Sequence, residues 1–247
     1  MQAWILGSLI FLSTQVFAQA QTALPVTPRL GQEYVQLEKP QPVDAGQSVE
    51  VTEFFAYFCH HCNDFEPYLE AWAKKQGKRI HLKRVHVNFY DLVTQQKLFY
   101  SLEAMGLVDT MQSKVFEAVH LHHNRLSTDA EVMKLVEKEK IDQKKFLKEY
   151  QSFTVSTKLA RTAQLMSDYK IDGVPTIAIE GRYLVSPSDL FAKAHNPPGG
   201  KVHAGIDVMD FLVDKIYREK NLTMNKAAVS SASEKKAKRT KPLATDH

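Results

Sequence analysis

Two cysteines that bracket two histidines form the most reactive stretch of the chain, C-H-H-C at residues 59 to 62. They are the only cysteines among 247 residues. Four side chains that can bind a metal ion stand side by side, and the two thiols are close enough in sequence to form a disulfide. Three alternatives follow from the residue types: a metal site, a structural disulfide and a redox-active pair.

The spacing gives little support to a metal site. Structural zinc is usually held by two pairs of ligands separated along the chain, and no second CxxC or HxxxH pair exists. The adjacent His60 and His61 cannot both turn inward with the cysteines on one short helical turn. His120, His122 and His123 form a second cluster, which we interpret as a solvated helix end. We therefore predict no metal site.

The position of Cys59 favours a redox-active pair over a structural disulfide, which would close a loop of only two residues and constrain the unfolded chain little. Residues 48–55 (SVEVTEFF) predict a buried strand, and an amphipathic stretch follows the motif. Cys59 would then face the free N–H groups and the positive dipole end of a helix, which stabilise a thiolate. Cys62 lies one turn further on, so we expect it to be the more buried, resolving sulfur. His61 could donate to the Cys59 sulfur or bring positive charge toward it.

Glu53 and Pro175 could serve the pair. Glu53 lies inside the predicted strand, where buried acids are rare without a partner. It is either at an exposed strand end or a buried carboxylate beneath the cysteines, where it would shuttle the proton of Cys62. Val174-Pro175 precedes another predicted strand, and cis peptide bonds are essentially confined to X–Pro. A cis Pro175 facing the cysteines would turn the Val174 backbone toward an extended substrate.

The elements around these residues predict a small mixed sheet interrupted by a block of helices. Residues 79–89 alternate as a second strand would. From residue 91 to about 170 there is almost no Gly or Pro, and apolar residues recur at helical spacing. This stretch predicts four or five helices, with caps near Thr128 and Asp142.

Three shorter strands and a final helix complete the pattern. Residues 33–37 could form a short strand before a Pro-containing turn. Residues 176–179 and 182–185 flank Glu180-Gly181, a signal typical of a β-hairpin. Residues 205–220 carry apolar side chains on one face and predict an amphipathic helix.

The formal net charge of +4 belongs to the last segment of the chain. Residues 221–247 contain six Lys and Arg against two acids, which is the whole excess. The body is therefore formally neutral, and this balance does not support a nucleic-acid partner. The Ala-, Ser- and Lys-rich composition predicts a disordered, solvated extension. A weak electrostatic contact with a membrane or a partner is the alternative.

The N-terminus, residues 1–20, predicts a secretory signal peptide. An apolar run from Ala3 to Leu12 leads to small residues at Ala18 and Ala20, which resemble a cleavage site. The run is too short to span a bilayer, so we predict cleavage after Ala18 or Ala20. The first residues lack Lys and Arg, and an uncleaved anchor is the alternative. Export implies an oxidising compartment in which disulfide chemistry is possible.

Three motifs together resemble the DsbA family of periplasmic thiol oxidases: FFAYFCHHC at residues 54–62, HVNF at 86–89 and GVPTIAIEGRYLV at 173–185. The resemblance extends from about residue 33 to residue 220. It implies an α/β, thioredoxin-like fold, in which a mixed central sheet is flanked by helices and interrupted by an all-helical domain.

The resemblance also assigns domains and roles to parts of this chain. Residues 21–90 and 167–220 would form the thioredoxin-like domain, and residues 91–166 the helical insertion. Cys59 would be the nucleophilic thiol and Cys62 the resolving one, joined by a disulfide in the oxidised protein. By the same resemblance, Glu53 is the buried acid and Pro175 the cis-proline, with Val174 beside it for substrate binding.

The resemblance also covers Arg84, and the chain departs from the family pattern at one dipeptide. Arg84 stands where the family often has a Lys that interacts with the buried acid. His60-His61 replaces the usual Pro-His dipeptide, so the preorganised first residue of the helix is lost. A second potential cation is gained near the sulfur of Cys59.

The resemblance implies a periplasmic dithiol oxidase of a Gram-negative bacterium, in which a substrate thiolate attacks the disulfide at Cys59. Its substrates would be unfolded exported polypeptides with free cysteines. Its reoxidant would be a membrane protein of the DsbB type. The resemblance implies no organic cofactor, no metal and a monomer. The alternatives are an isomerase or reductase with the same fold, and a non-enzymatic periplasmic carrier of metal or peptide.

Overall fold

The computed structural model describes residues 27–188 and 201–239. Within them, strands and helices follow one another largely as the sequence predicts. In chain order they are β1 (Val35–Gln36), β2 (Val49–Phe55), α1 (His60–Gln76), β3 (Ile80–His86), α2 (Val93–Ala104), α3 (Val108–His120), α4 (Asp129–Lys138), α5 (Gln143–Tyr150), α6 (Phe153–Asp168), β4 (Thr176–Ile179), β5 (Tyr183–Val185) and α8 (Lys201–Arg239). The five helices α2 to α6 confirm the helical block.

A five-stranded mixed sheet with the order β1-β5-β4-β2-β3 forms the centre of the molecule. Strand β2 pairs in parallel with β3 and antiparallel with β4, and the remaining pairs are antiparallel. All seven residues of β2 are buried, as expected for a strand that is covered on both faces. The register places Glu53 of β2 opposite Arg84 of β3 and Ile177 of β4.

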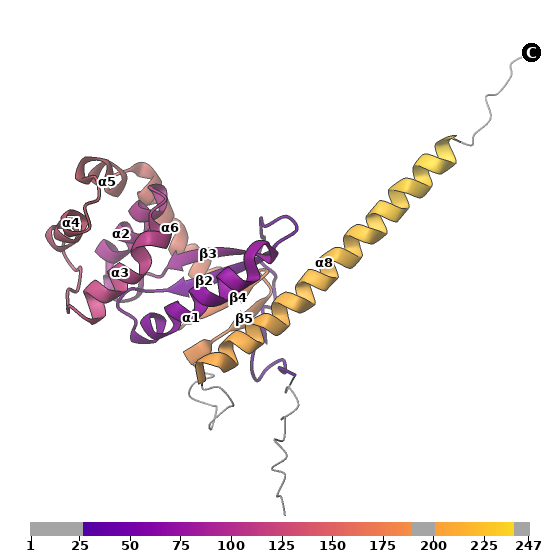
Figure 1. The fold of residues 1–247 in the computed structure, drawn as a ribbon, viewed down its shortest axis with the longest axis horizontal. Coiled ribbons are helices and arrows are strands. Elements are labelled where there is room, and N and C mark those ends of the chain that lie inside the picture. Colours follow the sequence, from indigo (N-terminus) through magenta and orange to yellow (C-terminus); the bar gives the residue numbers. More distant parts are fainter. Residues whose placement is uncertain (1–26, 189–200, 240–247) are drawn as a thin grey trace, which may run out of the picture.

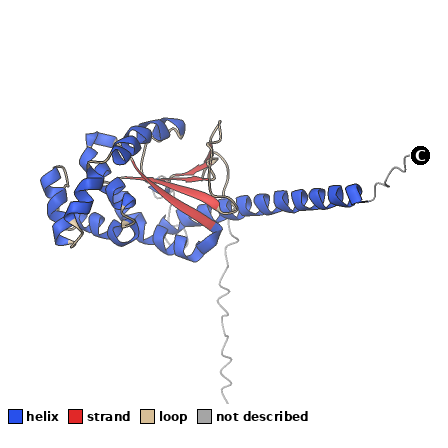
Figure 2. Ribbon diagram, turned by 90° about the horizontal axis from the view of Figure 1, so that it is seen from above, coloured by secondary structure: helices blue, strands red, loops and turns tan. Residues whose placement is uncertain are grey.

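Apolar side chains gather in two clusters. One joins the sheet to α1 and α8 and includes Val51, Leu69 and Leu212. The other joins the end of β2 to the helical block and includes Phe55 and Phe116. Figures 1 and 2 show the block at one end of the sheet and α8 leading away from it. The cysteine motif belongs to the second cluster, so it lies where the sheet meets the helical block.

Local sequence signals account for several element ends. Thr128 caps α4 and forms a capping box with Glu131, and Asp142 caps α5 by accepting from the N–H of Lys145. In the turn between β4 and β5, Glu180 and Gly181 both have positive φ, 52° and 59°. The predicted caps and hairpin are confirmed.

Helix α8 is longer than the sequence analysis predicts. It continues to Arg239, so the prediction of disorder is wrong for residues 221–239. Between Gly205 and Pro242 the chain has neither Gly nor Pro and is rich in Ala and Lys, which favour helix. Residues 240–247 and the predicted signal peptide lie outside the described residues. Among the helices that are described, none is long and apolar enough to cross a membrane.

Candidate active site

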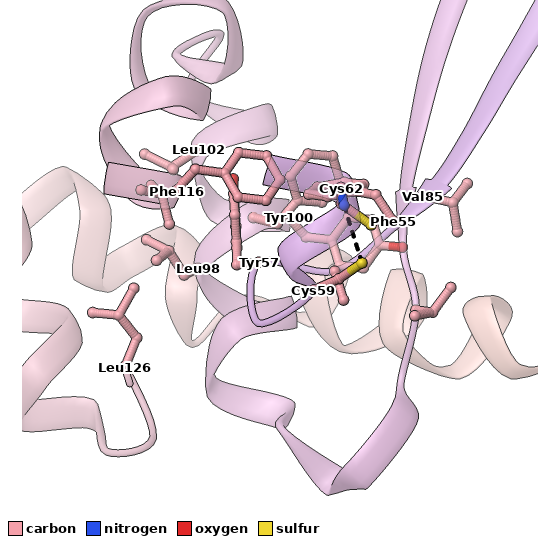
Figure 3. Close-up of a cluster of buried hydrophobic side chains, with 14 of the residues drawn as sticks. Phe55, Tyr57, Cys59, Cys62, Val85, Leu98, Tyr100, Leu102, Phe116 and Leu126 are labelled. Carbon is pink, nitrogen blue, oxygen red and sulfur yellow. Dashed lines mark hydrogen bonds between the residues drawn. The ribbon is translucent and has the colours of Figure 1, made fainter. Parts of the chain in front are cut away.

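The two cysteines lie at the junction of β2 and α1. Cys59 is the N-cap of α1, with an extended backbone (φ −78°, ψ 115°), and its Sγ accepts a hydrogen bond of 3.1 Å from the backbone N–H of Cys62. Figure 3 shows this bond beside the aromatic rings of Phe55 and Tyr57. Cys59 is 8% exposed and Cys62 is fully buried, as predicted. Both are free thiols in this structure, and the predicted disulfide stays a prediction.

The surroundings drive the acidities of the two thiols apart. The pKa of Cys59 is lowered mainly because the thiol of Cys62 donates to it, and the backbone N–H groups of Cys62 and His61 act in the same direction against burial. Burial is the main cause that raises the pKa of Cys62 well above its ordinary value. One sulfur is therefore prepared to carry charge as a thiolate, whereas the other is prepared to keep its proton.

The loop before β4 brings a backbone carbonyl to the reactive sulfur. The Val174-Pro175 peptide bond is cis, as the family resemblance implies. The Cys59 thiol donates to the carbonyl oxygen of Val174 across 3.4 Å, although the two residues are 115 positions apart. Pro175 is buried and Val174 is half-buried. A peptide held against Val174 would therefore lie directly beside Cys59.

The two histidines of the motif lie at the exposed start of α1. The His60 ring is 3.4 Å from the carboxylate of Asp64 and its centroid is 5.8 Å from that of His120. In the described residues no hydrogen bond joins either motif ring to a cysteine sulfur, and His61 lowers the pKa of Cys59 through its backbone N–H. The positive charge predicted for the His61 ring therefore stays a prediction.

His120 lies closer to the motif than the sequence suggests. Its Nε2 donates to the carbonyl oxygen of Tyr57 at 2.8 Å, so its interpretation as part of a solvated helix end is wrong. The sequence could not indicate this contact, because it depends on tertiary packing that brings the end of α3 against the loop before Cys59. His122 remains exposed beside Glu117. The described part of the chain has no group of three or more His, Cys, Asp and Glu side chains placed to hold a metal ion.

Glu53 is completely buried, so the alternative of an exposed strand end is wrong. Its Oε2 accepts a hydrogen bond of 3.1 Å from Nε of Arg84, and Nη2 of the same guanidinium donates to Oε1 of Glu66 at 2.6 Å. Burial raises the pKa of Glu53. Whenever Glu53 is ionised, its negative charge contributes to raising the pKa of both cysteines. The buried acid and the cysteine pair therefore act on each other electrostatically.

Three polar residues of this region are missing from the sequence analysis. Glu66 of α1 is 3% exposed, and burial, followed by any negative charge on Glu53, raises its pKa. The Oε2 of Glu66 lies 3.5 Å from Nε2 of Gln112, whose Oε1 accepts from the hydroxyl of Tyr57 at 2.9 Å. Helical spacing could have found Glu66, which is on the buried face of α1 with Phe65 and Leu69.

His86 is a further residue that the sequence analysis does not single out. Its ring is fully buried, with Nδ1 donating to the carbonyl oxygen of Val87 at 2.9 Å and Nε2 accepting from the N–H of Tyr57 at 3.1 Å. Burial lowers its pKa to about 4. The neutral ring thus fastens the end of β3 to the segment that leads into Cys59.

Comparisons with known proteins agree with this arrangement. The family model of the DSBA-like thioredoxin domain matches residues 67–196. The thiol:disulfide interchange protein DsbA of Burkholderia cepacia is 38% identical over 215 residues, which cover 86% of this chain and 97% of that protein. A crystal structure of Pseudomonas aeruginosa DsbA superposes with a TM-score of 0.70 at 30% identity, covering 78% of this chain and 97% of the other. Reduced DsbA1 from Neisseria meningitidis gives a TM-score of 0.67 at 28% identity, covering 80% and 100%. The predicted thioredoxin-like fold with inserted helices is confirmed.

Proposed function

Because the chain belongs to the DsbA family, we propose that it is a thiol:disulfide oxidase that introduces disulfide bonds into exported proteins. One observation carries the proposal: the Cys59 thiol caps α1 with a lowered pKa and lies beside the backbone of Val174. The partner sulfur, Cys62, is buried behind it. The pair can therefore be attacked at one sulfur only.

The reaction is two successive thiol–disulfide exchanges. A substrate thiolate attacks the Cys59 sulfur of the oxidised pair, so that the bond to Cys62 breaks and Cys62 leaves as a thiolate that takes up a proton. A second thiolate of the substrate then attacks the sulfur bound to Cys59, which forms the substrate disulfide and releases the Cys59 thiolate. Two electrons have passed from the substrate to the protein. In this direction the substrate itself completes the exchange, and Cys62 acts as the resolving thiol only in the reverse reaction.

The direction of transfer follows from the stability of the reduced form. Each unit by which the pKa of Cys59 is lowered favours its thiolate over the thiol by about 1.36 kcal/mol. A stabilised thiolate is a better leaving group and makes the disulfide a stronger oxidant. The hydrogen bonds to the Cys59 sulfur, from the thiol and the backbone N–H of Cys62, supply this stabilisation.

Glu53, Val174 and Pro175 have supporting roles in the proposal. Cys62 leaves as a thiolate in surroundings that raise its pKa, so it needs a nearby proton. The buried carboxyl of Glu53, whose pKa is also raised, is suited to deliver it. The cis Val174-Pro175 loop offers backbone groups to an extended substrate. His60 and His61 border the site and face solvent.

The proposal also covers location and partners. The cysteine pair itself stores the two electrons, so the reaction requires no organic cofactor or metal. The protein works in the periplasm of a Gram-negative bacterium, to which the predicted signal peptide directs it. Its substrates are unfolded exported polypeptides with free cysteines. Return to the disulfide form requires a membrane oxidant of the DsbB type, and the protein acts as a monomer.

The test is a redox equilibrium against glutathione together with oxidation of a reduced, unfolded ribonuclease. We expect the oxidised protein to be consumed stoichiometrically as ribonuclease disulfides form, and a Cys59→Ala variant to be inactive. A reduction potential near that of thioredoxin, about −270 mV, would refute the oxidase proposal. Faster rearrangement of scrambled ribonuclease than oxidation of the reduced form would identify an isomerase instead.

A further inference from the structure

A buried group of three ionisable side chains joins α1 to strands β2 and β3, and it contains two acids but only one base. It consists of the carboxyls of Glu53 and Glu66 and the guanidinium of Arg84 between them, whose side chains are 0%, 4% and 9% exposed. With both carboxyls ionised the group would carry a net negative charge, which is costly away from water. Near neutral pH the two carboxyls therefore share one proton.

Hydrogen bonds distinguish the two carboxyls. Both oxygens of Glu66 face donors, Oε1 the Arg84 guanidinium at 2.6 Å and Oε2 the Nε2 of Gln112 at 3.5 Å. Glu53 accepts from Arg84 through Oε2, whereas its buried Oε1 has no hydrogen-bond partner among the described residues. Donors to both oxygens favour the ionised form. The arrangement therefore favours an ionised Glu66 and a protonated Glu53.

The orientation of the Gln112 amide decides this difference. Its Oε1 accepts from the hydroxyl of Tyr57 at 2.9 Å, which turns Nε2 toward Glu66. Gln112 and Tyr57 are both fully buried. With the amide turned over, its oxygen would face Glu66, and Glu66 would have to hold the proton to make a hydrogen bond.

We propose that Tyr57 and Gln112 are positioning residues, which keep the shared proton on Glu53, the carboxyl that serves the cysteine pair. Other titratable groups act on this cluster. Glu70 of α1 raises the pKa of both carboxyls, and the two cysteines are coupled to the charge of Glu53. None of these groups has a hydrogen bond that would distinguish Glu66 from Glu53 in the described structure. The use of this proton in thiol–disulfide exchange rests on the proposed function. The location of the proton on Glu53 does not.

The test is a pH titration of the side-chain carboxyl carbons by ¹³C NMR, on the full chain in its reduced form. Glu53→Gln and Glu66→Gln variants assign the two signals. In the wild type near pH 7 we expect Glu53 to be protonated and Glu66 to be ionised. Tyr57→Phe should raise the midpoint of Glu66 by about one pH unit and lower that of Glu53.

A matched control and a second variant make the result decisive. Tyr100→Phe removes another buried hydroxyl, which is bonded to Thr162 at 2.6 Å outside the cluster, and should leave both midpoints in place. Gln112→Met removes both hydrogen bonds of the amide and should shift the midpoints as Tyr57→Phe does, so it decides the question if Tyr57→Phe does not fold.

A proton on Glu66 in the wild type would overturn the proposal, and so would unchanged midpoints in both variants. The titration uses no substrate, so absence of oxidase activity would refute the proposed function without altering these midpoints. If both proposals hold, the pH profile of exchange with a small dithiol shifts in Tyr57→Phe and not in Tyr100→Phe.

Discussion

Replacing His86 by Gln should change how the stability of the protein depends on pH. The His86 ring is fully buried and its pKa is lowered to about 4. The unfolded chain, with an ordinary histidine pKa of 6.5, takes up a proton first as the pH falls. The stabilising contribution of the neutral ring is therefore complete above pH 6.5 and is lost as the pH falls through about 4.

The size of the effect follows from the two pKa values. The interval from 6.5 to about 4 corresponds to about 3 kcal/mol at 1.36 kcal/mol per pKa unit. In His86→Gln this dependence disappears. At pH 7 the variant should be less stable than the wild type by about 1–3 kcal/mol, because the N–H of Tyr57 loses a well-placed acceptor. The stabilities of the two proteins should therefore converge as the pH approaches 4.

Urea unfolding of the reduced proteins at a series of pH values, followed by circular dichroism, measures this difference. The raised pKa of Glu66 makes the free energy of unfolding fall as the pH rises. This contribution is the same in both proteins, so it cancels in the difference between them. His81→Gln is the control, since His81 is exposed on the same strand, and it should follow the wild type. A difference between wild type and His86→Gln that stays constant with pH would refute the reasoning.

Three further predictions concern the core and the cysteine motif. Phe146→Ala should lower the free energy of unfolding, measured in urea, by about 3–5 kcal/mol, because the ring is fully buried in the helical block. The side chain of Leu147 is 40% exposed on the same helix, so Leu147→Ala should lower it by less than about 1 kcal/mol. Cys62→Ala should raise the pKa of Cys59, measured by the ultraviolet absorbance of the thiolate, because it removes the main hydrogen bond that lowers that pKa; an unchanged value would contradict the assignment. His60→Pro should stabilise the protein by about 0.4–1 kcal/mol. It should leave the pKa of Cys59 unchanged, because the backbone N–H groups that lower this pKa belong to residues 61 and 62.

Features that depend on neighbouring residues could be predicted from the sequence. The strand before the motif is a continuous run of β-formers, and the helix after it buries one face, so the position of Cys59 at the helix start follows from local pattern. The greater burial of Cys62 follows from its place one turn further along. The cis bond before Pro175 could be proposed because only a proline commonly permits it.

Features that depend on distant residues could not. The hydroxyl of Tyr57 meets Gln112 across 55 positions, and Gln112 meets Glu66 across 46. No pattern within one element indicates such contacts. Glu53 and Arg84 can therefore be named from the sequence, whereas Glu66 and Gln112 cannot be connected to them. His120 is a similar case, because its contact with the loop before Cys59 depends on how the helical block docks.

The end of helix α8 was predicted wrongly for a different reason. Its last part is rich in Lys and Ser, a composition typical of a solvated tail, but it contains no Gly or Pro. Local helix propensity was the better guide to the backbone.

The 115 positions between Cys59 and Val174 have a consequence for the order of assembly. During synthesis the cysteines are made long before the loop that will lie beside them, and the whole helical block is made in between. Contacts between such distant segments form late, because a large loop must close first. A chain interrupted before Val174 would therefore carry the thiol pair without the loop that we propose to bind substrate. If that loop binds substrate as proposed, complete activity reports that the last strands have joined the sheet.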